Sequence, residues 1–495
     1  MKKPPAFFYK YKVTLALSAM ILFIISLSVF IFSRQSLRLD EAQSLWQTSR
    51  SPLKIFNIIA QDVHVPLYHL MLHFWQVFLG NGVATGRALS MVFFVLSIPA
   101  IYFLGKLAYN KNAGLYAALL LSISPFMNWY GNEIRMYSLF TFVVILHQYF
   151  FLKLYKTADA ERRGGYWFLY GLVSLVGIFT HYFFWFSLVS QALFYLFNKD
   201  LFQKGDFKKF LAVIMILLLA ISPWLYYVLH LGTISNSSPQ LEAPTTVDIF
   251  NTFSQFLFGF QIDYVNTILV SMWPLLVLFG FFGLQKSKKR PSSETMYFIT
   301  ALIVPMALAF IVSSIFRPLY LSRYLILSLP PLYLCIIAFL NNLPPNFKRF
   351  FEIVLVVVMV GMLFIEAFSA FTPVKENYQQ ATDYLTAHAT ADDTIVVSAP
   401  FTIYPVEYYY HGSSTLTTLP IWDRSHYGPI PPFDAATLPA QVATITQNHQ
   451  NLWLLLSYNQ GYEEPLRLYF DTHYQRLLVK NFSLDLNLYE YKLRY

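Results

Sequence analysis

The most constraining feature of this 495-residue sequence is a series of apolar runs, most of them about 18–22 residues long, separated by short polar segments. Hydrophobic residues make up 56% of the chain and charged residues only 12%, whereas soluble globular proteins carry roughly 25% charged residues. A helix of this length crosses the hydrocarbon core of a bilayer. The sequence therefore predicts a polytopic α-helical membrane protein.

The first run, at about residues 13–33, follows four lysines and is expected to be an uncleaved span whose N-terminus lies in the cytoplasm. Residues 66–80 are too short for a full crossing and are expected to be partly inserted. The count is then about 11 crossings, with 12 or 13 as the alternatives. The remaining spans are expected near 85–107, 112–131, 135–155, 166–180, 182–198, 209–230, 264–284, 296–316, 321–341 and 350–371.

Lysines and arginines gather in short clusters between these runs, which is the positive-inside pattern of membrane proteins. The net charge of +9 is therefore not interpreted as a sign of nucleic acid binding. Loop 231–262 has no lysine or arginine and is expected outside, as are the turns at 132–135 and 317–323. The clusters expected in the cytoplasm are Lys106 and Lys111; Lys156, Arg162 and Arg163; Lys199 to Lys209; Lys286 to Arg290; and Lys348 and Arg349.

The composition changes at about residue 372. The sequence predicts a transmembrane module over 1–371 and a soluble α/β domain over 372–495, which the orientation above places outside the cytoplasm. Strands are expected at 395–398, 452–457 and 486–493, and helices at 378–388 and 436–448.

A polar loop, residues 34–65, joins the first two apolar segments and carries the first candidate site residues. Asp40 and Glu41 are adjacent, and His64 precedes a proline that suits the first turn of a helix. The simple interpretation is a solvated acidic pair beside the membrane. The functional interpretation is a general base in a site shielded from bulk water, with one carboxylate as catalyst and the other as a positioning group. Leu45, Trp46, Ile55, Phe56 and Ile59 predict one or two short amphipathic helices at the membrane surface within this loop.

Further ionisable and aromatic residues lie at the ends of apolar runs on the same predicted side. They mark helix boundaries or snorkelling side chains, or they line a polar site in which arginines clamp a phosphate. His69 and His73 have the spacing of a metal pair but no third ligand, so helix packing is favoured. Cys335 is the only cysteine, which excludes an intrachain disulfide. The residues in question are Arg87, Glu133, Arg135, Tyr137, His181, Arg323 and Tyr324.

The chain has neither a GxxxxGK[ST] phosphate loop nor a GxSxG elbow. A phosphate bound here would therefore be carried on a lipid.

Six short motifs occur in order: Leu39-Asp40-Glu41, His64-Val65-Pro66-Leu67-Tyr68, Arg87, Glu133-Ile134-Arg135-Met136-Tyr137, Thr180-His181-Tyr182 and Arg323-Tyr324. Over about residues 10–370 the chain resembles bacterial GT-C glycosyltransferases of the protein O-mannosyltransferase and aminoarabinose transferase group (family 39-like). The resemblance implies a polyprenyl-phosphate-linked sugar as donor, Asp40 as base, Glu41 as the neighbouring acid, and Arg87, Arg135 or Arg323 as phosphate ligands. The family more often has His-Pro-Pro where this chain has His64-Val65-Pro66.

The leading hypothesis is an inverting glycosyltransferase of the cell envelope, acting at the outer face of the cytoplasmic membrane on a hydroxyl of a glycan, lipid or protein acceptor. The alternatives are a lipid-linked polysaccharide polymerase or ligase, and a lipid flippase or transporter without chemistry. Transporters tend to place charges near the bilayer midplane and to show repeats, neither of which is expected here. The carboxylate pair would suit a divalent metal, although nothing in the sequence requires one.

Overall fold

The computed structural model describes residues 6–32, 34–62, 64–230, 241–286, 291–369, 375–424 and 430–493. Three predicted features lie wholly or partly outside these ranges: part of the outer loop (231–240), most of the Lys286–Arg290 cluster, and the domain boundary at 371–372. The chain forms two compact units. One contains the apolar helices, and the other combines Arg34–Val63 with Val374–Tyr495. Each unit is described by itself.

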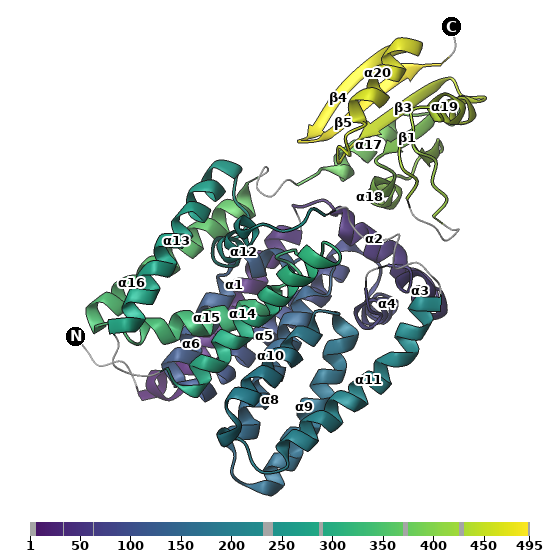
Figure 1. Cartoon of the computed structure of the whole chain (residues 1–495). Coiled ribbons are helices and arrows are strands. Elements are labelled where there is room, and N and C mark those ends of the chain that lie inside the picture. The colour runs from purple at the N-terminus through teal and green to yellow at the C-terminus, as the bar shows by residue number, and fades with distance from the viewer. Residues whose placement is uncertain are drawn as a thin grey trace. The chain divides into compact units, whose positions relative to one another are not determined.

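The helical unit forms a bundle of long and short helices (Figure 1). Its helices are α1 (Ala6–Phe32), α4 (Leu67–Leu79), α5 (Val83–Ala108), α6 (Lys111–Ser122), α7 (Pro125–Gly131), α8 (Tyr137–Lys156), α9 (Ala160–Thr180), α10 (Phe184–Phe197), α11 (Asp206–His230), α12 (Thr246–Phe258), α13 (Asp263–Lys286), α14 (Ser293–Ile315), α15 (Leu329–Leu340) and α16 (Pro345–Phe368), with short 3₁₀ turns at Lys199–Leu201 and Ile326–Ser328.

Six of the described helices are long and apolar enough to cross a bilayer, namely α1, α5, α8, α11, α14 and α16. The chain is therefore a multi-pass membrane protein, as its apolar runs predict. Helix α4 has 13 residues, a length of about 20 Å, which is less than the roughly 30 Å of a hydrocarbon core. This length agrees with the expectation that residues 66–80 do not cross the membrane alone.

Two predicted spans are interrupted in the structure. The run 112–131 is split into α6 and α7 at Ser124, whose hydroxyl accepts a hydrogen bond from the Met127 amide at 3.1 Å and so caps α7. The run 321–341 is helical only from Ile326, so Arg323 and Tyr324 lie in the turns before a helix rather than at its start. Both interruptions fall inside apolar sequence, where hydropathy alone carries no boundary signal.

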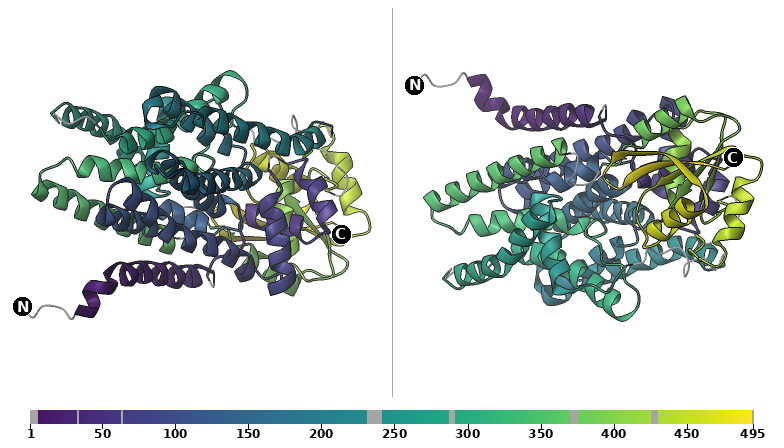
Figure 2. Two further views of the ribbon diagram at one scale, coloured as in Figure 1. Left: turned by 90° about the horizontal axis from the view of Figure 1, so that it is seen from below. Right: turned by 90° about the horizontal axis from the view of Figure 1, so that it is seen from above.

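Small residues allow α5 and α6 to approach closely. A Cβ added to Gly114 would lie 2.4 Å from the carbonyl oxygen of Tyr102, and one added to Gly105 would lie 2.9 Å from the Cα of Gly114. Glycine contacts of this kind are typical of helix packing in membranes. Helix α1 packs against α5 and α6 along one side of the unit (Figure 2).

The second unit is built on a five-stranded sheet with the strand order β2-β1-β3-β5-β4. β1 pairs in parallel with β2 and β3, and β5 pairs antiparallel with β3 and β4. The strands are β1 (Thr394–Ser398), β2 (Thr415–Thr418), β3 (Asn451–Leu456), β4 (Gln475–Ser483) and β5 (Leu486–Lys492), and the helices are α2 (Leu39–Thr48), α3 (Pro52–Ile59), α17 (Tyr378–His388), α18 (Ile403–Tyr409), α19 (Leu438–Thr446) and α20 (Glu463–His473), with a 3₁₀ turn at Pro400–Thr402.

Helices cover both faces of this sheet. On one face, α17 and α18 bury residues such as Leu385 and Val406 against Ile395 and Val397 of β1. On the other face, α19 and α20 pack around Val396. Because side chains alternate along a strand, the three consecutive apolar residues of β1 serve both cores. The predicted α/β domain is thereby confirmed.

The contact between α5 and α6 leads to a stability prediction. Gly114→Ala should lower the thermal unfolding midpoint of the full-length protein in detergent relative to Gly164→Ala, since the added methyl group meets the Tyr102 carbonyl. Gly164 lies in α9 with nothing within 4 Å of an added Cβ, so both variants share the same gain in helix propensity. The expected difference in the free energy of unfolding is about 1–3 kcal/mol, the usual cost of overpacking. Equal midpoints would show that the two helices are not in close contact.

Candidate active site

The charged cluster of the helical unit begins with the turn between α7 and α8. Every residue from 131 to 140 is buried, including Glu133 and Arg135, which are each 4% exposed. The sequence places these two residues in a short turn at a helix boundary. The structure encloses the whole turn in protein, which is costly for charged groups unless they have partners.

Arg135 makes the central contacts of this cluster. Its Nη2 donates to Nε2 of His64, 2.6 Å away, so this imidazole nitrogen acts as the acceptor. The hydroxyl of Ser90 donates to the Arg135 carbonyl at 3.2 Å. Tyr68 joins the same chain of contacts, because its hydroxyl lies 3.1 Å from that of Ser90. The start of α4, helix α5 and the turn before α8 therefore meet around one guanidinium.

Arg87 lies where α5 meets this turn. It is fully buried, in the second turn of the helix and three residues before Ser90. The preceding residue, Gly86, faces Ile134 so closely that an added Cβ would lie 2.7 Å from the isoleucine Cδ1. Arg87 and Arg135 are thus both buried close to this turn.

His181 connects this cluster to the segment before α15. Its ring stacks on Phe140 at 4.8 Å and lies 6.4 Å from the Tyr137 ring and 5.4 Å from the Tyr324 ring. The Arg323 guanidinium carbon lies 5.6 Å from the Tyr324 centroid.

The electrostatic setting keeps His181 neutral. This residue lies between α9 and α10, outside both helices, and its Nδ1 accepts a hydrogen bond from the Phe183 amide at 3.1 Å. Burial, together with the positive charges of Arg135 and Arg323, lowers the pKa of the imidazole to about 3. The ring is thus an uncharged group between two guanidiniums.

Eight of the ten predicted site residues therefore belong to the helical unit. His64 and Arg135 are in contact, and Tyr137, His181, Tyr324 and Arg323 form a second chain of contacts that Arg135 reaches electrostatically. Glu133 lies within the same buried turn, and Arg87 lies beside it. The remaining two, Asp40 and Glu41, belong to the other unit.

Asp40 and Glu41 lie in the first turn of α2 and have different environments. Glu41 is fully buried, and its Oε2 accepts a hydrogen bond from the Arg38 amide at 3.0 Å. This contact ties the start of the helix, as in a capping box. Asp40 is half-buried. The two adjacent carboxylates therefore point differently, with Glu41 in a position to orient the turn that carries Asp40.

The α/β domain surrounds this turn with polar groups. The Leu37 amide donates to the Tyr409 hydroxyl at 3.0 Å, and the Gln379 amide donates to the Ser36 hydroxyl at 3.2 Å. Tyr458 follows β3, with a positive φ of 57°, at the carboxyl ends of the parallel strands. This edge is where open α/β sheets commonly bind ligands.

Glu376, Tyr458 and Asp40 interact at this edge. Burial raises the pKa of the Glu376 carboxyl, while a backbone hydrogen bond, Tyr458 and the charge of Arg38 act in the opposite direction. Burial also raises the pKa of the Tyr458 hydroxyl, and the negative charges of Glu376 and Asp40 contribute. Tyr458 therefore stays a hydrogen-bond donor across the physiological pH range.

Trp46 attaches α2 to the same domain. Its ring lies 5.1 Å from the ring of Tyr404 in α18, and the guanidinium carbons of Arg50 and Arg424 lie 3.6 Å and 5.5 Å from its centroid. Arg424 also pairs with Glu407 at 2.5 Å. The predicted amphipathic helices are present as α2 and α3, and Trp46, which the sequence assigns to the membrane surface, packs against protein instead.

Metal ligands do not converge in the part of the chain that the structure describes: no three His, Cys, Asp or Glu side chains form a group that would hold an ion. His69 stacks beside His64 at 5.7 Å, which is the packing role that the sequence favours for it.

Comparisons with known proteins agree with this architecture. Residues 63–227 match the sequence model of the family described as dolichyl-phosphate-mannose-protein mannosyltransferase. Apo ArnT from Cupriavidus metallidurans is 12% identical, with a TM-score of 0.59 over 96% of this chain and 98% of that chain. The chain has the GT-C glycosyltransferase fold.

ArnT bound to undecaprenyl phosphate gives a TM-score of 0.60, again at 12% identity, over 96% of this chain and 97% of that chain. The Archaeoglobus fulgidus oligosaccharyltransferase in complex with Zn and sulfate gives 0.53 at 13% identity, over 89% and 68% of the two chains. No curated protein matches in sequence. The predicted resemblance to the mannosyltransferase and ArnT group is confirmed, and fold, family match and apolar helices together support a membrane glycosyltransferase.

Sequence reasoning on this GT-C chain missed several site residues. Ser90 lies one helical turn after Arg87, so its position on the same face of α5 was a usable signal. Glu376, Tyr409 and Tyr458 had no such signal. They are single residues in the C-terminal segment, and only the paired strands and the packed loop bring them to Asp40.

The docking of α2 leads to a second prediction. In the full-length protein, Trp46→Ala should accelerate amide hydrogen exchange in α2 by at least about tenfold, because the ring that links α2 to Tyr404, Arg50 and Arg424 is lost. Trp422→Ala serves as the matched control, since that ring also contacts Tyr404, at 6.1 Å. Protection of α2 that is unchanged in Trp46→Ala would show that the helix is held by other contacts.

Proposed function

We propose that this protein transfers a sugar from a polyprenyl-phosphate-linked donor to an acceptor hydroxyl at the outer face of the cytoplasmic membrane, with inversion at the anomeric carbon. The observation that carries the proposal is the buried group around Arg135, which combines two buried arginines, Arg323 and two histidines in a GT-C fold. The structure of ArnT with undecaprenyl phosphate supports the class of donor.

The arginines suit a phosphate ligand. A guanidinium presents a fork of donors that matches phosphate oxygens, and its charge persists when it is buried. His64 accepts a hydrogen bond from Nη2 of Arg135 and so helps to orient the guanidinium. His181 contributes a neutral polar edge, so that the charge in this region comes from the arginines. Arg87, Arg135 and Arg323 are therefore assigned to the donor phosphate, with Glu133 as a carboxylate that balances their charge.

The aromatic residues suit the sugar. Tyr137, His181 and Tyr324 present ring faces and polar edges in one chain of contacts. Sugars offer both C–H surfaces and hydroxyl groups, which such rings bind by apolar contact and hydrogen bonding.

Asp40 is assigned as the general base on the strength of its motif and its carboxylate chemistry, and Glu41 as the residue that orients it. Asp40 accepts the proton of the acceptor hydroxyl as the oxygen attacks the anomeric carbon. The bond between that carbon and the phosphate oxygen breaks, and polyprenyl phosphate leaves with the bonding electrons. The arginines stabilise the charge that develops on the leaving phosphate. One displacement inverts the anomeric configuration.

The base assignment is tested by Asp40→Asn. The variant should lower kcat for transfer from a polyprenyl-phosphate sugar by roughly 10²–10⁴-fold while donor binding is kept, because the amide cannot accept the proton in this way. The measurement is turnover with radiolabelled donor and a membrane lipid extract, together with the anomeric configuration of the product by NMR. Near-normal turnover of Asp40→Asn, or a product that retains the donor configuration, would contradict the proposal.

The contact between His64 and Arg135 gives a separate test. His64→Leu removes the acceptor at 2.6 Å from Arg135 and should raise KM for the donor by roughly tenfold, with a smaller change in kcat. His64→Gln, whose amide oxygen accepts a hydrogen bond, should recover part of the loss. His73→Leu is the control, since it removes a histidine from α4, nine positions after His64. Identical kinetics in the His64 and His73 variants would remove His64 from the site.

A further inference from the structure

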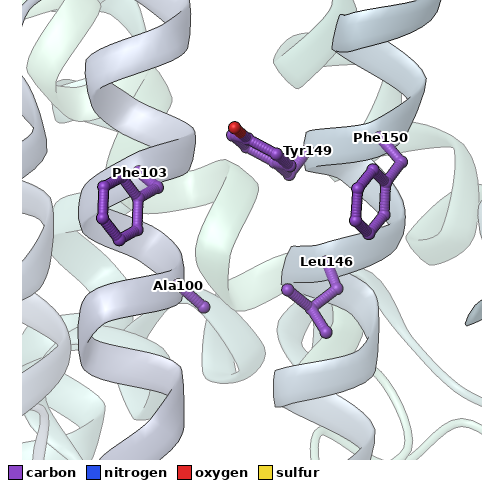
Figure 3. A pocket seen from close by; sticks show the side chains of 5 residues that line it. All are labelled: Ala100, Phe103, Leu146, Tyr149 and Phe150. Atoms are coloured by element: carbon purple, nitrogen blue, oxygen red, sulfur yellow. The ribbon is translucent and has the colours of Figure 1, made fainter. Parts of the chain in front are cut away.

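A cavity of about 230 Å³ lies between α5 and α8 of the helical unit. Ala100 and Phe103 line it from α5, and Leu146, Tyr149 and Phe150 line it from α8 (Figure 3). The Tyr149 hydroxyl is the one side-chain oxygen among these five residues, so the cavity is apolar. Tyr149 points from α8 into the space between the two helices (Figure 3).

The cavity is distinct from the charged cluster. α5 contacts the turn before α8 through the hydrogen bond from Ser90 to the Arg135 carbonyl, and it contacts the first part of α8 through the rings of Phe93 and Phe142 at 6.1 Å. Ala100 lies 13 residues beyond Arg87, a distance of about 20 Å along the helix. There the small alanine side chain leaves space opposite Leu146. Phe103 is 49% exposed, so this part of the interface lies at the surface of the unit.

Two lysines stand over rings that line the cavity. Lys106 Nζ lies 5.9 Å from the centroid of Phe103, and Lys153 Nζ lies 5.5 Å from that of Tyr149. Contacts of this kind are weak at exposed sites and leave the ammonium groups available. Lys156, one turn further along α8, instead pairs with Glu294 at 2.5 Å. Within the described residues, Lys106 and Lys153 have aromatic contacts and no such acidic partner.

We propose that this cleft binds one anionic phospholipid, with an acyl chain in the cavity and the phosphate between Lys106 and Lys153. An apolar cavity at a surface that faces lipid suits an acyl chain, and basic pockets between transmembrane helices bind anionic headgroups. Each lysine lies about one helical turn after a ring that lines the cavity. A lipid could therefore place its acyl chain beside the rings and its phosphate beside the lysines. The proposed orientation of the protein places this lipid in the cytoplasmic leaflet.

The probe is dioleoyl-phosphatidylglycerol, with dioleoyl-phosphatidylcholine as the neutral comparison, titrated onto the full-length protein in dodecyl maltoside. Native mass spectrometry should show one phosphatidylglycerol retained more strongly than phosphatidylcholine. The variant Lys106→Gln/Lys153→Gln should weaken this binding by roughly thirtyfold. The matched control is Lys208→Gln/Lys209→Gln, which removes the same charge from exposed positions at the start of α11 and should bind as the wild type does.

A second variant tests the acyl chain. Ala100→Phe fills the cavity and keeps both lysines, so it should weaken phosphatidylglycerol binding while size-exclusion behaviour is unchanged. If both double-lysine variants lost phosphatidylglycerol binding equally, the effect would be one of general surface charge, and the proposal would be overturned. Wild-type affinity in Ala100→Phe would do the same. The proposal would also be overturned if undecaprenyl phosphate displaced phosphatidylglycerol and its own binding depended on Ala100 but not on the two lysines. The cavity would then hold the donor lipid.

Discussion

The contact between Arg135 and His64 is the interaction on which the helical site depends. A guanidinium that is 4% exposed cannot be kept away from water without partners, and an imidazole 2.6 Å away supplies one of them. That imidazole lies three residues before the start of α4 at Leu67. Ser90 of α5 must also lie where its hydroxyl can donate a hydrogen bond to the Arg135 carbonyl. The position of one buried charge thus determines how three segments, far apart in the sequence, are arranged.

The same constraint explains the mixture of long and broken helices. The long helices α5 and α8 supply apolar surface toward the bilayer, whereas the interruptions at Ser124 and at 317–325 release backbone from regular helix near the charged cluster. Non-helical backbone between membrane helices is tolerated where it is enclosed by protein. The buried turn at 132–136, with its two ionisable side chains, is the clearest example.

Much of this architecture was predictable from hydropathy and charge. The long spans follow from apolar runs, helix α17 has the predicted bounds of Tyr378–His388, and the apolar runs of β1 and β3 identify buried central strands. The two missed strands, β2 and β4, form the edges of the sheet and are more exposed, so they lack that apolar signal.

Part of the site was also predictable, since Arg87, Arg135 and His181 are conspicuous as polar residues at the ends of apolar runs. Their mutual distances were not. His64 and Arg135 are 71 positions apart, and only the folded bundle joins them.

The membership of residues 34–62 in the same compact unit as the C-terminal domain has a practical consequence for protein engineering. A truncation that ends the chain near residue 372 would strip α2 of Tyr404 and Arg424, and the residue Leu37 before it of Tyr409. A chimera that exchanges the C-terminal domain with that of a relative must likewise exchange the loop after the first helix. The two stretches behave as one module, although more than 300 residues separate them in the gene product.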